Sequence, residues 1–86
     1  MNRRILVTGS SRGIGKAIAL ELAKAGFDVT VHARSRQSEA EVVAQEIQAL
    51  GQASNVLMFD VNEREKIAAI LEQDIAQHGA FYGAVL

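Results

Sequence analysis

The sequence has no cysteine, and this absence excludes a disulfide framework, a zinc site built on thiolates and a cysteine nucleophile. A surplus of positive charge is missing too, because the sequence has 9 Lys and Arg residues and 10 Asp and Glu residues, for a formal net charge of −1. Neither a nucleic acid nor an acidic membrane is therefore an expected partner. No apolar run approaches the roughly 18 residues of a membrane-spanning helix. The short run Ile5-Leu6-Val7 after two arginines falls below the ~7–15 residues of an export signal core. We therefore expect a cytoplasmic protein.

Linkers, internal repeats and low-complexity segments are absent as well, so no domain boundary is visible within the 86 residues. A chain of this length holds one domain at most. Its content of hydrophobic residues (49%) and charged residues (22%) is ordinary for a folded soluble domain.

Short apolar segments alternate with amphipathic ones along the whole chain. The pattern predicts strands over residues 5–7, 29–31, 56–59 and 84–86. The first predicted helix covers about 14–25. A capping box of Ser38 and Glu41 opens the second, which ends at Gly51, and Asn62 with Glu65 opens the third, which Gly79 closes. Strands joined by helices form a parallel sheet with right-handed crossovers. The expected fold is therefore α/β, a Rossmann-type doubly wound sheet of strand order 3-2-1-4 with helices on both faces.

A glycine-rich stretch, Thr8-Gly9-Ser10-Ser11-Arg12-Gly13-Ile14-Gly15, directly follows the first predicted strand and opens the first helix. A helix start leaves backbone N–H groups unpaired and carries partial positive charge, so it attracts an anion. Gly9 allows a sharp turn off the strand, Gly13 lets backbone approach a pyrophosphate, and Gly15 allows close packing of the helix. Ser10 and Ser11 either donate to phosphate or stabilise the turn. This stretch predicts a dinucleotide site.

The residues after the second strand favour NADP over NAD. An acidic residue at this position selects NAD through the ribose hydroxyls, but here Ala33 and Arg34 follow His32. Arginine binds a 2′-phosphate with two hydrogen bonds and stacks on adenine, and Arg12 in the loop adds a second positive charge. We therefore expect NADPH or NADP as the cofactor.

The remaining candidates follow the third strand, where ligands of such sheets also bind. Asp60 and Val61 directly follow this strand, and Asn62 rather than Asp60 is the expected helix cap. His32 and His78 stand apart from each other and from any carboxylate cluster, so both are interpreted as structural, and no metal site is expected. The candidate cofactor-binding residues are Gly9, Ser10, Ser11, Arg12, Gly13, Ile14, Arg34, Asp60 and Val61.

Together, the glycine pattern from Thr8 to Gly15 and the pair Asp60-Val61 resemble the classical branch of the short-chain dehydrogenase/reductase family. In that family the aspartate of this pair contacts the edge of the adenine, so the resemblance implies this role for Asp60. Within the family, the sequence of the loop is most similar to bacterial reductases of 3-oxoacyl-[acyl-carrier-protein] in fatty-acid synthesis. The usual aspartate before the fourth strand is replaced here by Tyr82. The resemblance implies that 1–86 is the N-terminal part of a single dinucleotide-binding domain.

The family's catalytic groups, a Ser and a Tyr-x-x-x-Lys pair, would lie beyond Leu86, as would its Asn-Ala-Gly motif. Tyr82 is the only tyrosine and is followed four residues later by Leu86, so no catalytic residue is assigned within the chain. The resemblance implies NADPH-dependent reduction of a small or carrier-linked carbonyl substrate by an intact protein that is a homo-oligomer. Another short-chain carbonyl or acetoacetyl-CoA reductase, and a non-catalytic nucleotide-binding module, stay open as alternatives.

Overall fold

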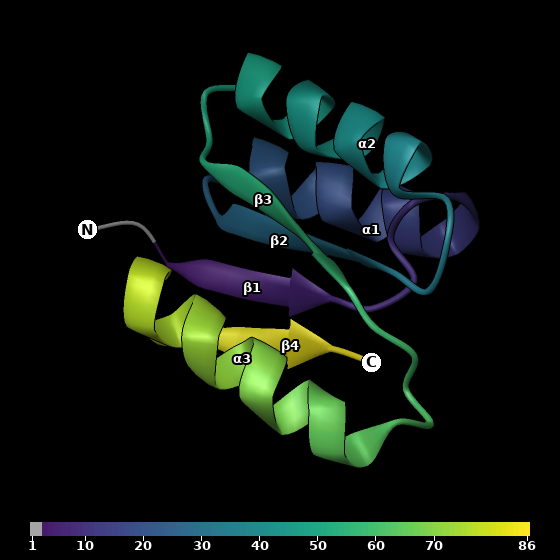
Figure 1. Ribbon diagram of the computed structural model, residues 1–86. Coiled ribbons are helices and arrows are strands. Elements are labelled where there is room, and N and C mark those ends of the chain that lie inside the picture. The colour runs from purple at the N-terminus through teal and green to yellow at the C-terminus, as the bar shows by residue number, and fades with distance from the viewer. Residues whose placement is uncertain (1–2) are drawn as a thin grey trace.

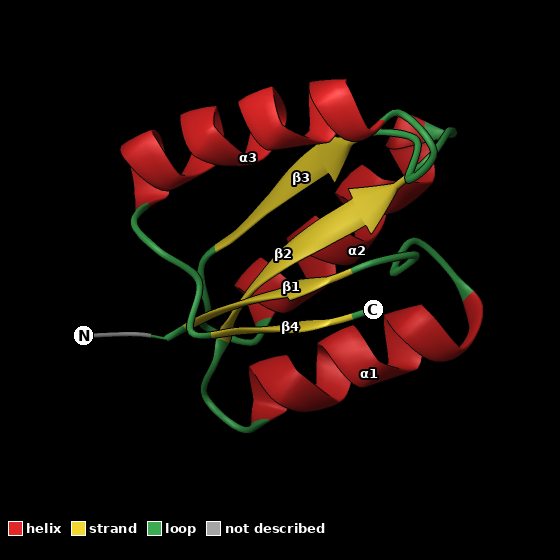
Figure 2. Ribbon diagram, turned by 90° about the horizontal axis from the view of Figure 1, so that it is seen from below, coloured by secondary structure: helices red, strands yellow, loops and turns green. Residues whose placement is uncertain are grey.

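A four-stranded parallel sheet in the order β3-β2-β1-β4 forms the centre of the computed structural model, which describes residues 3–86. Along the chain the elements are β1 (Arg4–Val7), α1 (Gly13–Lys24), β2 (Asp28–Ala33), α2 (Gln37–Ala49), β3 (Ser54–Met58), α3 (Arg64–His78) and β4 (Gly83–Val85). Helices α1 and α2 lie on one face of the sheet and α3 lies on the other (Figures 1 and 2). The predicted fold class, strand order and placement of helices on both faces are confirmed.

The main core lies between the sheet and the α1–α2 layer. Alternate strand residues point to this layer, and the register aligns Val7 with Val31 and Val31 with Val56. Val31 and Ile47 of α2 are both fully buried, and burying a side chain of this size contributes about 1.5–3 kcal/mol. The fully or nearly buried members of this core are Ile5, Val7, Ala19, Ala23, Val29, Val31, Ala33, Ala40, Val43, Ala44 and Ile47.

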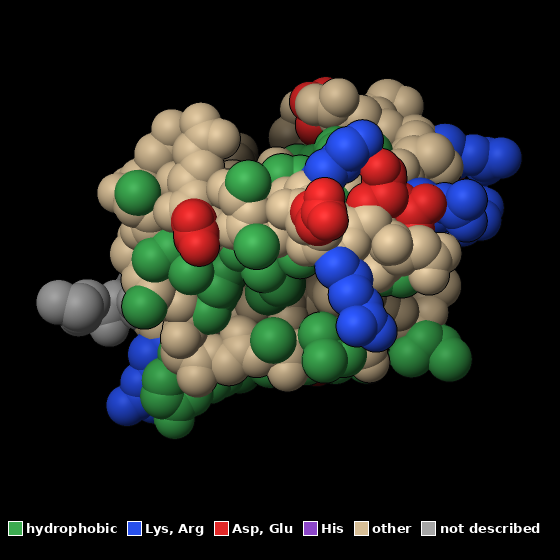
Figure 3. All heavy atoms as spheres, turned by 60° about the horizontal axis from the view of Figure 1, so that its bottom comes forward, with side chains coloured by type: hydrophobic (Ala, Val, Ile, Leu, Met, Phe, Trp, Pro, Cys, Tyr) green, Lys and Arg blue, Asp and Glu red, His purple; other side chains and the backbone are tan. Residues whose placement is uncertain are grey.

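The opposite face of the sheet is held to α3 by polar contacts instead. The only buried residue of α3 is Asp74, which meets Arg4 of β1 and Asn55 of β3. Its apolar positions stay partly exposed, with Ile75 39% accessible. Figure 3 shows apolar side chains gathered over the middle and lower part of this view, with most of the charged side chains toward the right.

Both predicted capping boxes are wrong. Helix α2 begins two residues earlier than a cap at Ser38 would place it, after Arg36 in the left-handed conformation (φ 59°), so that Ser38 lies inside the helix and caps nothing. Helix α3 follows Glu63, and Asn62 is not its cap. The backbone N–H of Asn62 instead donates to Asp60 Oδ1 (2.9 Å), so the carboxylate already satisfies this turn.

In residues 3–86, no helix combines the length and the apolar character that crossing a bilayer requires. Within the same residues, no three histidine or acidic side chains come together as a candidate metal site.

Candidate functional site

The glycine-rich loop turns off β1 and leads into α1 at the carboxyl edge of the sheet. Gly9 and Gly13 have φ of +63° and +64°, a left-handed backbone that side chains with a Cβ rarely adopt. A Cβ added to Gly15 would lie 2.2 Å from the carbonyl oxygen of Gly9, so α1 starts in contact with the loop backbone. The roles expected for Gly9 and Gly15 as a turn and a close approach match this geometry.

The helix start offers unpaired hydrogen-bond donors. In the described part of the chain, the N–H groups of Ser11, Arg12, Gly13 and Ile14 form no hydrogen bond, as at the first turn of any helix. A Cβ on Gly13 would meet nothing within 4 Å, so the space in front of this backbone is open. The next residue, Ile14, is exposed, with 81% of its surface accessible.

Ser10 faces the other way. Its side chain is fully buried, and its Oγ donates to the carbonyl of Val7 (2.7 Å) and accepts from the N–H of His32 (3.0 Å). The Ser10 N–H donates in turn to the carbonyl of His32 (3.0 Å). Of the two roles left open for this serine, the contacts favour stabilisation of the turn.

A cavity of about 460 Å³ opens between the loop and the segment after β2. Three arginines, Arg12, Arg34 and Arg36, line it, and its one acidic residue is Glu39. Glu39 forms an ion pair with Arg36 (3.6 Å), whereas Arg12 has no ion pair within residues 3–86. The cavity therefore carries net positive charge beside the open helix start. The complete lining is Gly9, Ser11, Arg12, Ala33, Arg34, Ser35, Arg36 and Glu39.

The two candidates after β2 and β3 meet across the edge of the sheet. The Nε of Arg34 lies 3.3 Å from Asp60 Oδ2, with the arginine side chain 74% and the aspartate side chain 24% accessible. The other carboxylate oxygen of Asp60 accepts the N–H of Asn62, which fixes the carboxylate in place. Val61 is 56% accessible. The structure thus brings Arg12, Arg34, Asp60 and the glycine loop to one edge, as the sequence predicted.

Sequence reasoning missed two features of this edge. Arg36 was not among the candidate residues, although it lines the cavity. Its position directly before α2, at the same edge as the loop, was the available signal. His32 was interpreted as structural, and it is buried, but its ring also binds the glycine loop directly.

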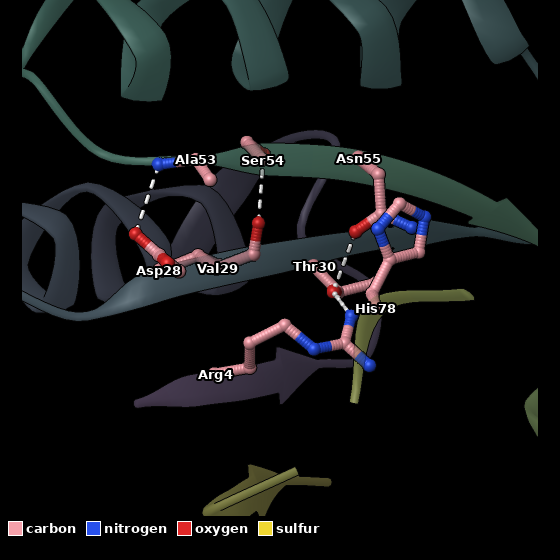
Figure 4. A pocket seen from close by; sticks show the side chains of 8 residues that line it. All are labelled: Arg4, Asp28, Val29, Thr30, Ala53, Ser54, Asn55 and His78. Atoms are coloured by element: carbon pink, nitrogen blue, oxygen red, sulfur yellow. Dashed lines mark hydrogen bonds between the residues drawn. The ribbon is translucent and has the colours of Figure 1, made fainter. Parts of the chain in front are cut away.

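A second cavity, of about 120 Å³, lies at the opposite edge of the sheet (Figure 4). It lies near the start of all three strands β1, β2 and β3, and His78, the last residue of α3, closes one side. Most of its polar side chains bond to one another or to backbone, as in the bond from Arg4 Nη1 to Thr30 Oγ1 (3.0 Å). It contains none of the predicted cofactor-binding residues.

The parallel sheet, its order and the glycine-rich turn at its carboxyl edge define a Rossmann-type α/β fold. A family model described as short chain dehydrogenase matches residues 3–83. The chain belongs to the short-chain dehydrogenase family, and the resemblance seen in its motifs is confirmed.

Three similar proteins illustrate the relationship. The chain is 60% identical over 86 residues to 3-oxoacyl-[acyl-carrier-protein] reductase FabG of Aggregatibacter actinomycetemcomitans, covering all of this chain and 36% of that protein. The crystal structure of acetoin dehydrogenase YohF from Salmonella typhimurium matches with a TM-score of 0.89 and 30% identity, over 98% of this chain and 35% of that one. Gluconate 5-dehydrogenase from Burkholderia cenocepacia, solved in complex with NADP and tartrate, matches with a TM-score of 0.82 and 34% identity, over 94% and 32% of the two chains. The chain thus spans about a third of the length of each.

Proposed function

We propose that this chain is the cofactor-binding, N-terminal part of an NADPH-dependent reductase. The observation that carries the proposal is the arginine-lined cavity beside the open start of α1. A dinucleotide with a 2′-phosphate needs one anion site for its pyrophosphate, which the helix start offers, and a second for its 2′-phosphate, which the arginines offer. When bound, NADPH supplies the hydride for reduction of a carbonyl group.

The described residues fit such a cofactor. The free N–H groups of Ser11 to Ile14 suit the pyrophosphate, and the open space at Gly13 permits its close approach. Arg12 and Arg34, which line the cavity, would hold the 2′-phosphate, and Asp60 would accept from the adenine amino group. Ile14 and Val61 offer exposed apolar surface, whereas Gly9 and Ser10 shape the loop.

For the substrate, we propose 3-oxoacyl-[acyl-carrier-protein], reduced to the 3-hydroxyacyl form in fatty-acid synthesis. This rests on the 60% identity to FabG of Aggregatibacter actinomycetemcomitans, which is much higher than the 30% identity to acetoin dehydrogenase YohF. The latter similarity keeps reduction of a small carbonyl compound as the second candidate. We further propose that the intact protein is a cytoplasmic homo-oligomer.

Replacing Arg34 with Asp is expected to shift the intact protein from NADPH toward NADH. The substitution removes a charged hydrogen bond worth about 1.5–3 kcal/mol, which corresponds to a roughly 10- to 100-fold loss of NADPH affinity. The new carboxylate also repels the 2′-phosphate and accepts from the ribose hydroxyls of NADH. Affinities for both cofactors, measured by fluorescence titration, give the preference.

Arg64→Asp is the matched control, since it makes the same charge change at the exposed first residue of α3, outside the cavity. It should leave the preference unchanged. A wild-type protein that binds NADH as tightly as NADPH would contradict the assignment of Arg34.

The 86-residue chain by itself is expected to reduce nothing. Its one tyrosine, Tyr82, is 62% accessible at the start of β4 and has Leu86, not lysine, four residues later, so no paired proton donor is present. The assay follows NADPH absorbance with a 3-oxoacyl thioester and, separately, with a small diketone. Turnover that co-purifies with the 86-residue chain would overturn this expectation. The same assay on the intact protein decides between the two substrate classes, according to which of the two compounds is reduced faster.

A further inference from the structure

His32 joins the two halves of the candidate site through its ring. Its Nδ1 lies 3.0 Å from the backbone N of Gly9, and its Nε2 lies 2.8 Å from the carbonyl oxygen of Phe59. Gly9 begins the glycine-rich loop, and Phe59 directly precedes Asp60-Val61. The residue is 3% accessible, so no water competes for these bonds.

The two partners fix the protonation state of the ring. A backbone N–H can only donate, so Nδ1 must be the unprotonated acceptor. A backbone carbonyl can only accept, so Nε2 must carry the hydrogen. The ring is therefore neutral and in a single tautomer, and a second proton on Nδ1 would place a donor against a donor.

The rest of the residue has little freedom to adjust. The N–H and carbonyl groups of His32 are both bonded to Ser10, each at 3.0 Å. The imidazole also packs on the ring of Phe59, with 4.0 Å between the centroids. Because the His32 side chain cannot move, loss of a hydrogen bond at its ring displaces the backbone of the glycine-rich loop.

We propose that His32 is a positioning residue for the cofactor, whose neutral ring sets the glycine-rich loop against the Asp60-Val61 segment through its bonds to Gly9 and Phe59. The inference rests on the proposed function, because the loop and Asp60 are assigned there to different parts of one dinucleotide. His32 does not touch the cofactor in this account. It acts through Gly9 and Phe59.

Other charged groups surround this region but do not bond to the ring. They are Arg12 on the loop, Arg34 after β2, Asp60 after β3, and Glu63 and Lys66 at the start of α3. Asp60 is engaged with Arg34 and with the N–H of Asn62. The hydrogen bond and charge of Glu63 raise the pKa of Lys66, so this lysine stays protonated throughout the range in which histidines titrate.

Two substitutions separate the two bonds of the ring. In His32→Asn the amide oxygen takes the place of Nδ1 and can accept from Gly9, whereas in His32→Gln the amide nitrogen takes the place of Nε2 and can donate to Phe59. Neither side chain titrates. His78→Gln, at the end of α3 and remote from the loop, removes the only other histidine and is the matched control.

The experiment measures the affinity of the intact protein and of each variant for NADP⁺ at about pH 8. His78→Gln should bind NADP⁺ as tightly as wild type, because it leaves the bonds of His32 intact. At about pH 8, His32→Asn should bind within about two-fold of wild type and His32→Gln several-fold more weakly, since only the asparagine keeps the bond to Gly9.

Nitrogen NMR of the His32 ring gives a readout without cofactor. The expected result is the Nε2–H tautomer at about pH 8, with the Gly9 amide signal displaced in His32→Gln but not in His32→Asn. Equal NADP⁺ affinities for wild type and both His32 variants, or a ring protonated on Nδ1, would overturn the inference. Absence of NADP⁺ binding by the wild-type protein, with the NMR result as expected, would instead contradict the proposed function.

Discussion

Replacing Gly15 with alanine is expected to destabilise the fold by more than about 3 kcal/mol, the upper part of the range for overpacked sites. The added Cβ would lie 2.2 Å from the oxygen and 2.8 Å from the carbon of the Gly9 carbonyl. Both atoms belong to the backbone, so no side chain can rotate away. Helix α1 would have to move off the loop, which also displaces the free N–H groups proposed to bind pyrophosphate.

Chemical unfolding of the intact protein, followed by circular dichroism, measures the loss, and a titration with NADP⁺ measures the effect on the site. Gly51→Ala is the control for the close approach, because Gly51, unlike Gly15, has a positive φ (+92°) but has nothing within 4 Å of an added Cβ. The control should cost only about 1–2 kcal/mol, from the left-handed backbone alone. Equal unfolding midpoints for the two variants would show that the close approach at Gly15 does not matter.

The order of the elements could be predicted from the sequence because it depends on local patterns. Apolar runs bounded by glycines give the strands, and the parallel arrangement follows from the helices between them. The strand starts could not be predicted in the same way. Ser54 and Asn55 of β3 are polar, and they belong to the strand because Ser54 Oγ donates to the carbonyl of Val29 (2.7 Å) and Asn55 Oδ1 accepts from Thr30 (2.7 Å). These partners lie 25 residues away in the sequence, where a local pattern does not reach.

In the candidate site too, some features follow from local sequence patterns and others from contacts between distant residues. The positions of Arg12, Arg34 and Asp60 at one edge follow from the rule that parallel strands end together. The bond between His32 and Gly9 and the left-handed Arg36 before α2 depend on how side chains fit after folding. The capping boxes failed for a related reason, since Asp60 satisfies the turn before α3 and leaves no role for Asn62.

The attachment of α3 depends on a buried ion pair that no sequence pattern indicated. Arg4 Nη2 lies 2.8 Å from Asp74 Oδ2, and the two side chains are 10% and 2% accessible. Asn55 donates to the other carboxylate oxygen (2.7 Å), and Arg4 also donates to the carbonyl of Gly79 (2.6 Å). The guanidinium lies over the ring of Phe81, 4.1 Å from its centroid. The network thus connects β1, β3 and α3 with Gly79 and Phe81 of the segment between α3 and β4.

Asp74→Ala is expected to destabilise the protein by about 3–5 kcal/mol, because it leaves the Arg4 charge buried without its partner. The Nε of Arg4 is already buried without a hydrogen bond, so the remaining contacts cannot compensate. The double variant Arg4→Met/Asp74→Leu removes both charges and should recover most of the loss, since apolar side chains replace such pairs at little cost. Glu21→Ala is the control: it breaks the exposed pair with Lys24 (3.4 Å; side chains 75% and 58% accessible) and should cost less than about 1 kcal/mol. Chemical unfolding of wild type and the three variants measures these differences in stability. Equal unfolding midpoints for Asp74→Ala and Glu21→Ala would mean that the partly exposed apolar face of α3, and not the ion pair, holds the helix to the sheet.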